Sequence, residues 1–326
     1  MSNTDLSKID VHCHYIPAFY REALIANGHS RPDGIWGIPE WSEAGALAAM
    51  NKIGVAKAYL SISSPGVHFG DDAAARDLAR RVNEEGARLA RTHPDRFGFF
   101  ASTPLPDIDG TLTEIAYAFD VLGASGVVFE TNFDGMYLGN ETLEPIYAEL
   151  DRRNAVLFLH PTSPAAPCTG HAPELRYPRP MLEFFFDTTR TVTDLVLTGV
   201  LERYPNLQVI VPHAGAALPI LASRIDVIGA RMAGKEGQDP MRNALRQLHF
   251  DLAGMPLPEL LPALLSVADP SHLHYGSDLP FTPLREVEVW ADRLATAAVP
   301  GDQELGELLR ANSEALLTRK GATLPR

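Results

Sequence analysis

Near its N-terminus the chain reads Lys8-Ile9-Asp10-Val11-His12-Cys13-His14-Tyr15-Ile16-Pro17, a short apolar stretch that ends in two histidines and is stopped by a proline. Residues i and i+2 of a β-strand point to the same face, so we expect the imidazoles of His12 and His14 to lie side by side. Cys13 points to the other face and is expected to pack as a small apolar side chain. The pair is either part of a metal site or two ordinary packed side chains. The choice depends on whether further ligand residues occur in the rest of the chain.

Seven further apolar segments follow, each separated from the next by helical sequence: 56–63, 97–102, 125–130, 155–160, 207–213, 249–253 and 273–278. Apolar runs of this kind are typical of a buried parallel sheet. Eight strands predict an α/β fold of the (β/α)8 TIM-barrel type, a single domain over residues 1–326 with inserted loops at its C-terminal face. The alternative, an open doubly wound sheet, needs a Gly-rich phosphate loop after the first strand, and the sequence has none.

Two long loops accompany this pattern. Residues 19–40 form a short helix and an irregular, Gly- and Pro-containing stretch that includes Trp36, and residues 161–180 are dense in proline. Long loops in compact domains are usually functional. We therefore expect residues 19–40 to form a lid over the end of the first strand.

Charge and cysteine content limit the class of protein. The 326 residues contain 28 Lys and Arg against 41 Asp and Glu, a net charge of -13, which argues against nucleic acid or an anionic membrane as a partner. The two cysteines suggest no disulfide framework, and the sequence shows neither a signal peptide nor an apolar run long enough to cross a membrane. We expect a cytoplasmic protein.

Four of the predicted strands end in metal-ligand residue types: His12 and His14, His160, His213 and Asp278. A TIM barrel has its active site at the carboxyl ends of the strands, so these side chains are predicted to converge. Histidines and a carboxylate suit zinc, or manganese if further oxygen ligands join. A lone histidine is usually structural, and the remaining ones are assigned that role: His29, His68, His93, His171, His249, His272 and His274.

Around these residues the sequence resembles the amidohydrolase superfamily. The segments concerned are 10–17, Phe158-Leu159-His160-Pro161, Val211-Pro212-His213-Ala214-Gly215-Ala216-Ala217 and Tyr275-Gly276-Ser277-Asp278. They look most like its decarboxylase branch, which includes the aminocarboxymuconate semialdehyde, methylsalicylate and resorcylate decarboxylases. The intact HxH pattern places the chain nearer to the aminocarboxymuconate and methylsalicylate enzymes, since several resorcylate-type relatives have a glutamate in this motif.

The resemblance implies that His12, His14, His160 and Asp278 hold one divalent metal, with His213 beside it. It implies His213 and Asp278 as the catalytic residues, either of which delivers a proton. Two-metal hydrolases often carry a carboxylated lysine after strand four, where this chain has Glu130. Glu130 either bridges a second metal or is a polar residue that lines the mouth of the barrel.

A carboxylate substrate requires a cation, and the candidates are Arg190 and Arg224, because guanidinium binds carboxylates bidentately. In the family, a position like Arg224 reaches the site of a neighbouring subunit, which implies a homodimer. The candidates for an aromatic wall around the substrate are Phe184, Trp36 and Tyr15, although aromatic side chains are more often core residues.

The function expected from the resemblance is metal-dependent, non-oxidative decarboxylation of a 2-hydroxy aromatic acid or a similar conjugated carboxylic acid, by a carbon–carbon lyase. A metal-dependent hydrolase or hydratase, for instance a lactonase, would use the same residues to activate water. A barrel that binds a ligand without chemistry is the third interpretation, and it predicts no bound metal.

Overall fold

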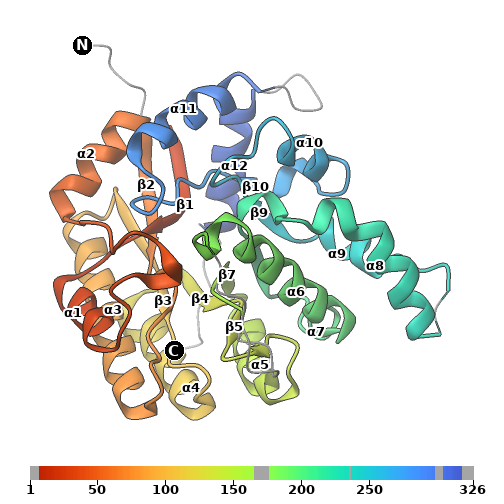
Figure 1. Ribbon diagram of the computed structural model, residues 1–326, viewed down its shortest axis with the longest axis horizontal. Helices are drawn as coiled ribbons and strands as arrows, with labels where there is room; N and C mark the ends of the chain where they lie inside the picture. The colour runs from red at the N-terminus through yellow and green to blue at the C-terminus, as the bar shows by residue number, and fades with distance from the viewer. Residues whose placement is uncertain (1–6, 165–175, 235, 298–303, 318–326) are drawn as a thin grey trace, which may run out of the picture.

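The computed structural model describes residues 7–164, 176–234, 236–297 and 304–317. Its main sheet has eight parallel strands, which follow one another in chain order around a barrel (Figure 1). They are β1 (Lys8–His14), β2 (Val55–Ser61), β3 (Phe97–Ser102), β4 (Gly126–Glu130), β7 (Val156–His160), β8 (Gln208–Val211), β9 (His249–Asp251) and β10 (Leu273–His274).

The barrel closes between the last strand and the first. The amide of Val11 donates to the carbonyl of Tyr275 at 3.0 Å, and the amide of His14 donates to the carbonyl of Leu279 at 2.7 Å. The predicted (β/α)8 barrel is confirmed.

The predicted ends of the two strands that carry His213 and Asp278 are wrong. Strand β8 ends at Val211 and β10 at His274, so His213 and Asp278 lie beyond the strands rather than at their last positions. Pro212 has no N–H group to continue the ladder of β8. After β10 the chain meets β1 only through isolated bridges, and the amide of Asp278 donates instead to the carbonyl of His12 at 2.7 Å.

Helices surround the barrel on its outside (Figure 1). Their bounds are α1 (Ala18–Ala26), α2 (Glu43–Ile53), α3 (Asp72–Thr92), α4 (Ile108–Tyr117), α5 (Glu144–Arg152), α6 (Glu183–Leu197), α7 (Val200–Arg203), α8 (Leu218–Met232), α9 (Pro240–Leu245), α10 (Leu260–Leu265), α11 (Leu284–Ala295) and α12 (Leu305–Leu317). A short hairpin that the sequence did not predict follows β4, formed by β5 (Asn132–Phe133) and β6 (Met136–Tyr137). None of the described helices is long and apolar enough to cross a membrane.

The interior of the barrel is a packed apolar layer with a polar layer above it. Val11, Tyr59, Phe100, Val128 and Phe158 belong to one buried cluster that also contains Val156 and Ile210. Because side chains alternate along a strand, the residues that follow on the same face reach the mouth of the barrel. These are the polar Ser61 on β2, Ser102 on β3, Glu130 on β4 and His160 on β7.

Strand β1 contains a register shift between Asp10 and Cys13. Val11 and His12 both lie within the shifted stretch, where Val11 joins the interior cluster while His12 meets His14 at the mouth. Cys13 is buried in the outer core, among the residues that pack between barrel and helices, as the sequence predicted. The irregularity therefore lets one strand fill the barrel and supply two side chains to the same site.

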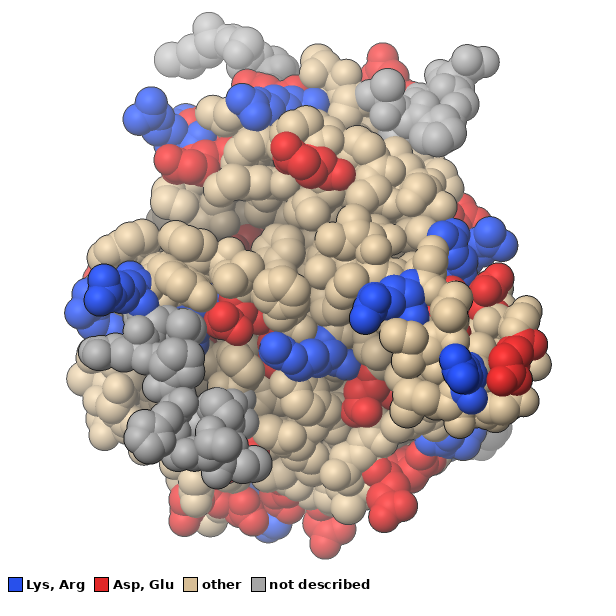
Figure 2. Space-filling view, turned by 45° about the vertical axis from the view of Figure 1, so that its right-hand side comes forward, with Lys and Arg blue, Asp and Glu red and all other residues tan. Residues whose placement is uncertain are grey.

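Charged side chains of both signs are interspersed on the face shown in Figure 2, with no single basic patch on that face.

Candidate metal centre and adjoining cavity

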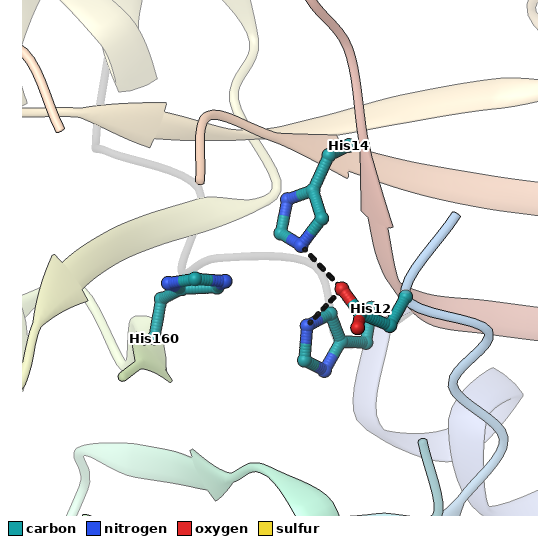
Figure 3. A group of neighbouring side chains, drawn as sticks. His12, His14 and His160 are labelled. Atoms are coloured by element: carbon teal, nitrogen blue, oxygen red, sulfur yellow. Dashed lines mark ion pairs between the residues drawn. The ribbon is translucent and has the colours of Figure 1, made fainter. Parts of the chain in front are cut away.

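Four side chains meet at the carboxyl end of the barrel. One ligand atom from each of His12, His14, His160 and Asp278 lies within 4.8 Å of the others. The rings of His12 and His14 project from β1 and that of His160 from the end of β7, toward a common point (Figure 3). These are the four residues that the sequence predicted as metal ligands.

The two histidines of β1 are oriented by hydrogen bonds at Nδ1. His12 Nδ1 lies 2.9 Å from Asp251 Oδ2, and His14 Nδ1 donates to the carbonyl oxygen of Ser61 at 3.2 Å. Their Nε2 atoms are buried and have no hydrogen-bond partner among the described residues. They lie 3.5 Å (His12) and 3.3 Å (His14) from the same oxygen, Asp278 Oδ1. With a proton on Nδ1 and none on Nε2, each ring would present an Nε2 lone pair to a cation held between the two rings and the carboxylate.

Burial and neighbouring charges together set the protonation of the four side chains. It lowers the pKa of His14 and of His160 to about 4, so both rings are neutral at neutral pH and able to bind a metal. Burial also acts to lower the pKa of His12, but the charge of Asp251 outweighs it and raises the pKa to about 9. Burial acts to raise the pKa of Asp278, but the close contact with the His14 ring and the charge of His12 hold that pKa well below its ordinary value.

This donor set fits one divalent metal ion. Three imidazoles and one carboxylate match the ligands that zinc takes, and manganese accepts them with further oxygen ligands. When bound, the ion would supply Lewis-acid chemistry to a substrate oxygen.

His213 lies beside this group rather than within it. Its ring centroid is 5.1 Å from that of His12 and 5.6 Å from that of Phe185. Burial lowers its pKa to about 4, so it is neutral at neutral pH. The backbone is left-handed at His213 (φ 55°) and at Asp278 (φ 57°), a conformation that costs free energy in residues other than glycine and that often occurs at functional sites.

Asp251, at the end of β9, is a site residue that the sequence reasoning missed. Its Oδ2 accepts from His12, while its Oδ1 accepts from the amides of His213 at 3.0 Å and Ala253 at 2.9 Å. One carboxylate thus positions both a metal ligand and the neighbouring histidine. The sequence did offer one signal for Asp251. It lies in the predicted strand 249–253, and an acidic residue there is expected near the same end of the barrel as the predicted ligands.

Glu130 is not part of the four-residue group. Its Oε2 lies 3.4 Å from His160 Nδ1, and burial, then the charges of Asp33 and Asp187, raise its pKa well above the ordinary value. It forms part of the wall between the group and a cavity of about 1110 Å³. This placement agrees with the interpretation of Glu130 as a polar residue of the mouth.

The cavity extends from Glu130 over the ends of β2, β3 and β4, and residues of the predicted lid contribute to it. Arg31 and Asp33 from the segment 19–40 line it, together with Arg179 and Arg190. The metal-ligand candidates themselves do not line it, so the cavity begins beside the group rather than over it. Residues 165–175 of the second long loop lie outside the described residues.

The predicted substrate residues lie in different places. Arg190 lines the cavity, and Phe184 is buried with its ring 6.3 Å from that of His160. Arg224 is exposed on α8 and lines a separate, apolar groove between α6 and α8, which also reaches Arg190.

Two predicted wall residues lie away from the cavity, and this corrects their assignment. Tyr15 is 1% exposed and donates from its hydroxyl to the carbonyl of Val82 at 2.7 Å, because it follows His14 and points to the opposite face, toward α3. Trp36 is 84% exposed and does not line the cavity, so it is a surface residue of the segment 19–40.

Comparison with known proteins identifies the family of this chain. The family model described as amidohydrolase matches residues 9–319. The chain belongs to the amidohydrolase superfamily. A 6-methylsalicylic acid decarboxylase of Aspergillus aculeatus is 37% identical over 324 residues, which cover 96% of each chain. Among solved structures, one described as amidohydrolase II is 39% identical, with a TM-score of 0.89, over 96% of this chain and 100% of the other.

A further solved structure shares the fold of this amidohydrolase. It is the 5-carboxyvanillate decarboxylase of Novosphingobium aromaticivorans in complex with manganese, 22% identical, with a TM-score of 0.77 and coverage of 97% of this chain and 99% of that chain. The resemblance to the decarboxylase branch is confirmed, and with it the predicted enzyme class, since decarboxylases are carboxy-lyases.

Proposed function

We propose that this amidohydrolase is a metal-dependent, non-oxidative decarboxylase of a 2-hydroxy aromatic acid of the salicylate type. The observation that carries the proposal is the convergence of His12, His14, His160 and Asp278, with His213 adjacent and a cavity beginning beside them. The similarity to a 6-methylsalicylic acid decarboxylase over nearly the whole chain supports the substrate class.

His12, His14, His160 and Asp278 would hold the metal ion, which when bound would act as a Lewis acid toward the substrate. Because His213 is neutral at neutral pH, it can accept the proton of the substrate hydroxyl group and return it to the carbon that bears the carboxylate. Asp278 is the alternative proton carrier. Cleavage of the carbon–carbon bond then releases CO2, and its electron pair restores the aromatic ring.

The metal is proposed to be a single divalent ion. Zinc is the choice from the ligand types, and manganese is the alternative because the 5-carboxyvanillate decarboxylase was solved with manganese. Metal analysis of the purified protein, followed by chelation and reconstitution with either ion, identifies the one that restores activity.

Arg190 is the proposed cation for the substrate, because it lies in the cavity. Asp187 Oδ1, 3.8 Å from Arg190, can orient it. Phe184, near His160, is the proposed wall against the ring.

We also propose a homodimer in which Arg224 acts in the site of the partner subunit, since Arg224 is exposed beside an apolar groove. Mixing inactive Arg224→Ala and Asp278→Asn proteins tests this sharing, and regained activity is the expected result. Activity that stays absent in mixed dimers, or an Arg224→Ala protein that is fully active alone, contradicts it.

A panel of salicylates tests the function. We expect CO2 release from at least one 2-hydroxybenzoate and none from the matching benzoate without the hydroxyl group, because the hydroxyl group would supply the proton that His213 transfers. Turnover of a lactone or an amide, without decarboxylation anywhere in the panel, would replace the proposal with hydrolysis.

A further inference from the structure

We propose that the hydroxyl groups of Ser102 and Thr103 form a second polar subsite on the floor of the cavity, which recognises an oxygen substituent on the far side of the substrate ring. This inference rests on the proposed function and narrows its substrate class. The preferred substrate would then be a salicylate with a further hydroxyl group at ring position 4 or 5.

The register of β3 directs Ser102 into the mouth of the barrel. Phe100 belongs to the interior cluster and stacks on Tyr59 with ring centroids 5.7 Å apart. Ser102 follows two residues later and therefore faces the same way. It pairs with Val128 of β4, and Ser102, Thr103 and Val128 all line the cavity.

Both hydroxyl groups are buried and without a partner. Ser102 is 4% exposed and Thr103 is 5% exposed, and neither side-chain oxygen has a hydrogen-bond partner among the described residues. A buried hydroxyl group without a hydrogen bond costs free energy, and most buried polar groups are paired. Two such groups next to each other on a cavity floor are explained if a ligand supplies the missing partner.

The floor is held rigidly. The side chain of Asn83, on α3, accepts from the amide of Ser102 at 2.8 Å and donates to its carbonyl at 2.9 Å. Asn83 also donates to Glu114 at 2.8 Å, and Glu114 accepts from Arg80 at 2.9 Å. The end of β3 is thereby fixed to α3 and α4, which pre-organises the two hydroxyl groups for a ligand.

The distance across the barrel selects the ring position. Strand β4 lies between β3 and β7, so roughly 10 Å separates the floor from the strand that carries His160, at about 4.8 Å per strand. A benzoate ring with its carboxylate at the metal site and an oxygen on its far side extends along this direction, past Glu130. The far-side positions of a salicylate are 4 and 5.

Matched substrate pairs test the subsite. The pairs are 2,4-dihydroxybenzoate with 4-methylsalicylate and 2,5-dihydroxybenzoate with 5-methylsalicylate, compared for kcat/KM and, by calorimetry on the metal-loaded protein, for binding. We expect the wild type to prefer the hydroxyl member of at least one pair. Ser102→Ala and Thr103→Val should each lower that preference by on the order of 10-fold, the value of one hydrogen bond.

Thr111→Val is the matched control. The Thr111 hydroxyl is also buried and without a partner among the described residues, but Thr111 lies on α4 and does not line the cavity. Its removal should leave the hydroxyl-to-methyl ratio unchanged.

The outcomes separate the two proposals. Decarboxylation of both members of each pair with the same ratio in the wild type and both variants overturns the subsite and leaves the proposed function standing. A hydroxyl preference in binding that the two variants lose, without any CO2 release, supports the subsite and overturns decarboxylation. If the protein neither releases CO2 nor binds the hydroxyl member of a pair more tightly, both proposals are overturned.

Discussion

At the residue scale, Asp251 shows how one carboxylate can serve two functional histidines. It accepts from the His12 ring through one oxygen and from the His213 backbone through the other. The second contact lies at a residue with left-handed backbone, so Asp251 also contributes to holding His213 in a conformation of higher energy. Its loss is expected to disturb the metal site and His213 together.

Asp251→Asn should weaken metal binding by about 10- to 100-fold, because the partner that fixes the ligating tautomer of His12 is replaced by a neutral amide. Titration of the metal-free protein with zinc or manganese measures the change. Asp226→Asn is the control, since Asp226 is a buried carboxylate that accepts from the amides of Met241 and Arg242 away from the site. Equal metal affinity in Asp251→Asn and wild type would show that Asp251 has no positioning role.

His12→Ala and Asp278→Asn should each abolish decarboxylation, and His12→Ala should also reduce the bound metal, because each removes one member of the four-residue group. Kinetics together with metal analysis gives both readouts. His93→Gln, which changes a histidine that contacts Glu43 far from the site along the outer helices, should remain active. Full activity in either site variant contradicts the assignment.

The metal-ligand residues could be predicted from the sequence, because a histidine or an acid near the end of a predicted barrel strand is expected at the mouth of the barrel. The positioning residues were not predictable in the same way. Asp251 differs from other buried acids only in its contacts, and those depend on the register between β9 and its neighbours. Tyr15 was misassigned although the strand alternation that turns Cys13 outward turns Tyr15 outward too, whereas the loop sequence around Trp36 does not reveal which way its side chain points.

At the element scale, the register shift in β1 decides which side chains reach the site. It allows Val11 to pack inside the barrel while His12 and His14 face the mouth. The next residue, Tyr15, then points outward and ties β1 to α3 through its bond to Val82.

Tyr15→Phe should lower the free energy of unfolding by about 1 kcal/mol, the typical value of one hydrogen bond, and leave KM unchanged. Urea denaturation and steady-state kinetics measure the two effects. Trp36→Ala should change neither, because the side chain is largely exposed. A rise in KM without a loss of stability in Tyr15→Phe would restore Tyr15 as a substrate contact.

The arrangement of strands and helices was predictable at this scale, since eight apolar runs with helical sequence between them allow few folds. The end of β8 could have been predicted from Pro212, which has no N–H group, whereas the end of β10 depends on how its backbone pairs with β1. The hairpin β5–β6 was also missed, since strands of two residues carry no periodicity.

At the scale of the whole molecule, a buried histidine network ties the last strand to the last helix. His274 of β10 contacts His249 of β9 at 2.8 Å and Ser313 of α12 at 2.9 Å. Burial lowers the pKa of His274 to about 3, so the folded protein keeps this ring neutral. The assignment of His249 and His274 as structural residues agrees with these contacts.

Stability should therefore fall as the pH falls from 7 to 5. In this window the unfolded chain protonates His274, whose ordinary pKa is 6.5, while the folded chain does not, so the unfolded state binds more protons and unfolding becomes easier. The contribution of His274 at pH 5 is about 2 kcal/mol.

Urea denaturation of wild type and His274→Gln at both pH values measures this contribution. The loss between pH 7 and pH 5 should be smaller in the variant, since glutamine can hydrogen-bond but does not titrate. The same loss in both proteins would assign the pH dependence to other groups.

The junction between β10 and β1, where the barrel closes, has a consequence for how the enzyme acquires its metal ion. The barrel is closed there by few backbone bonds, and Asp278 sits on one side of the junction while His12 and His14 sit on the other. An ion held by these side chains would link the first and the last strand of the barrel. Ion capture would thus have to wait until β10 has docked beside β1, because the ligands on the two sides of the junction are not together before then.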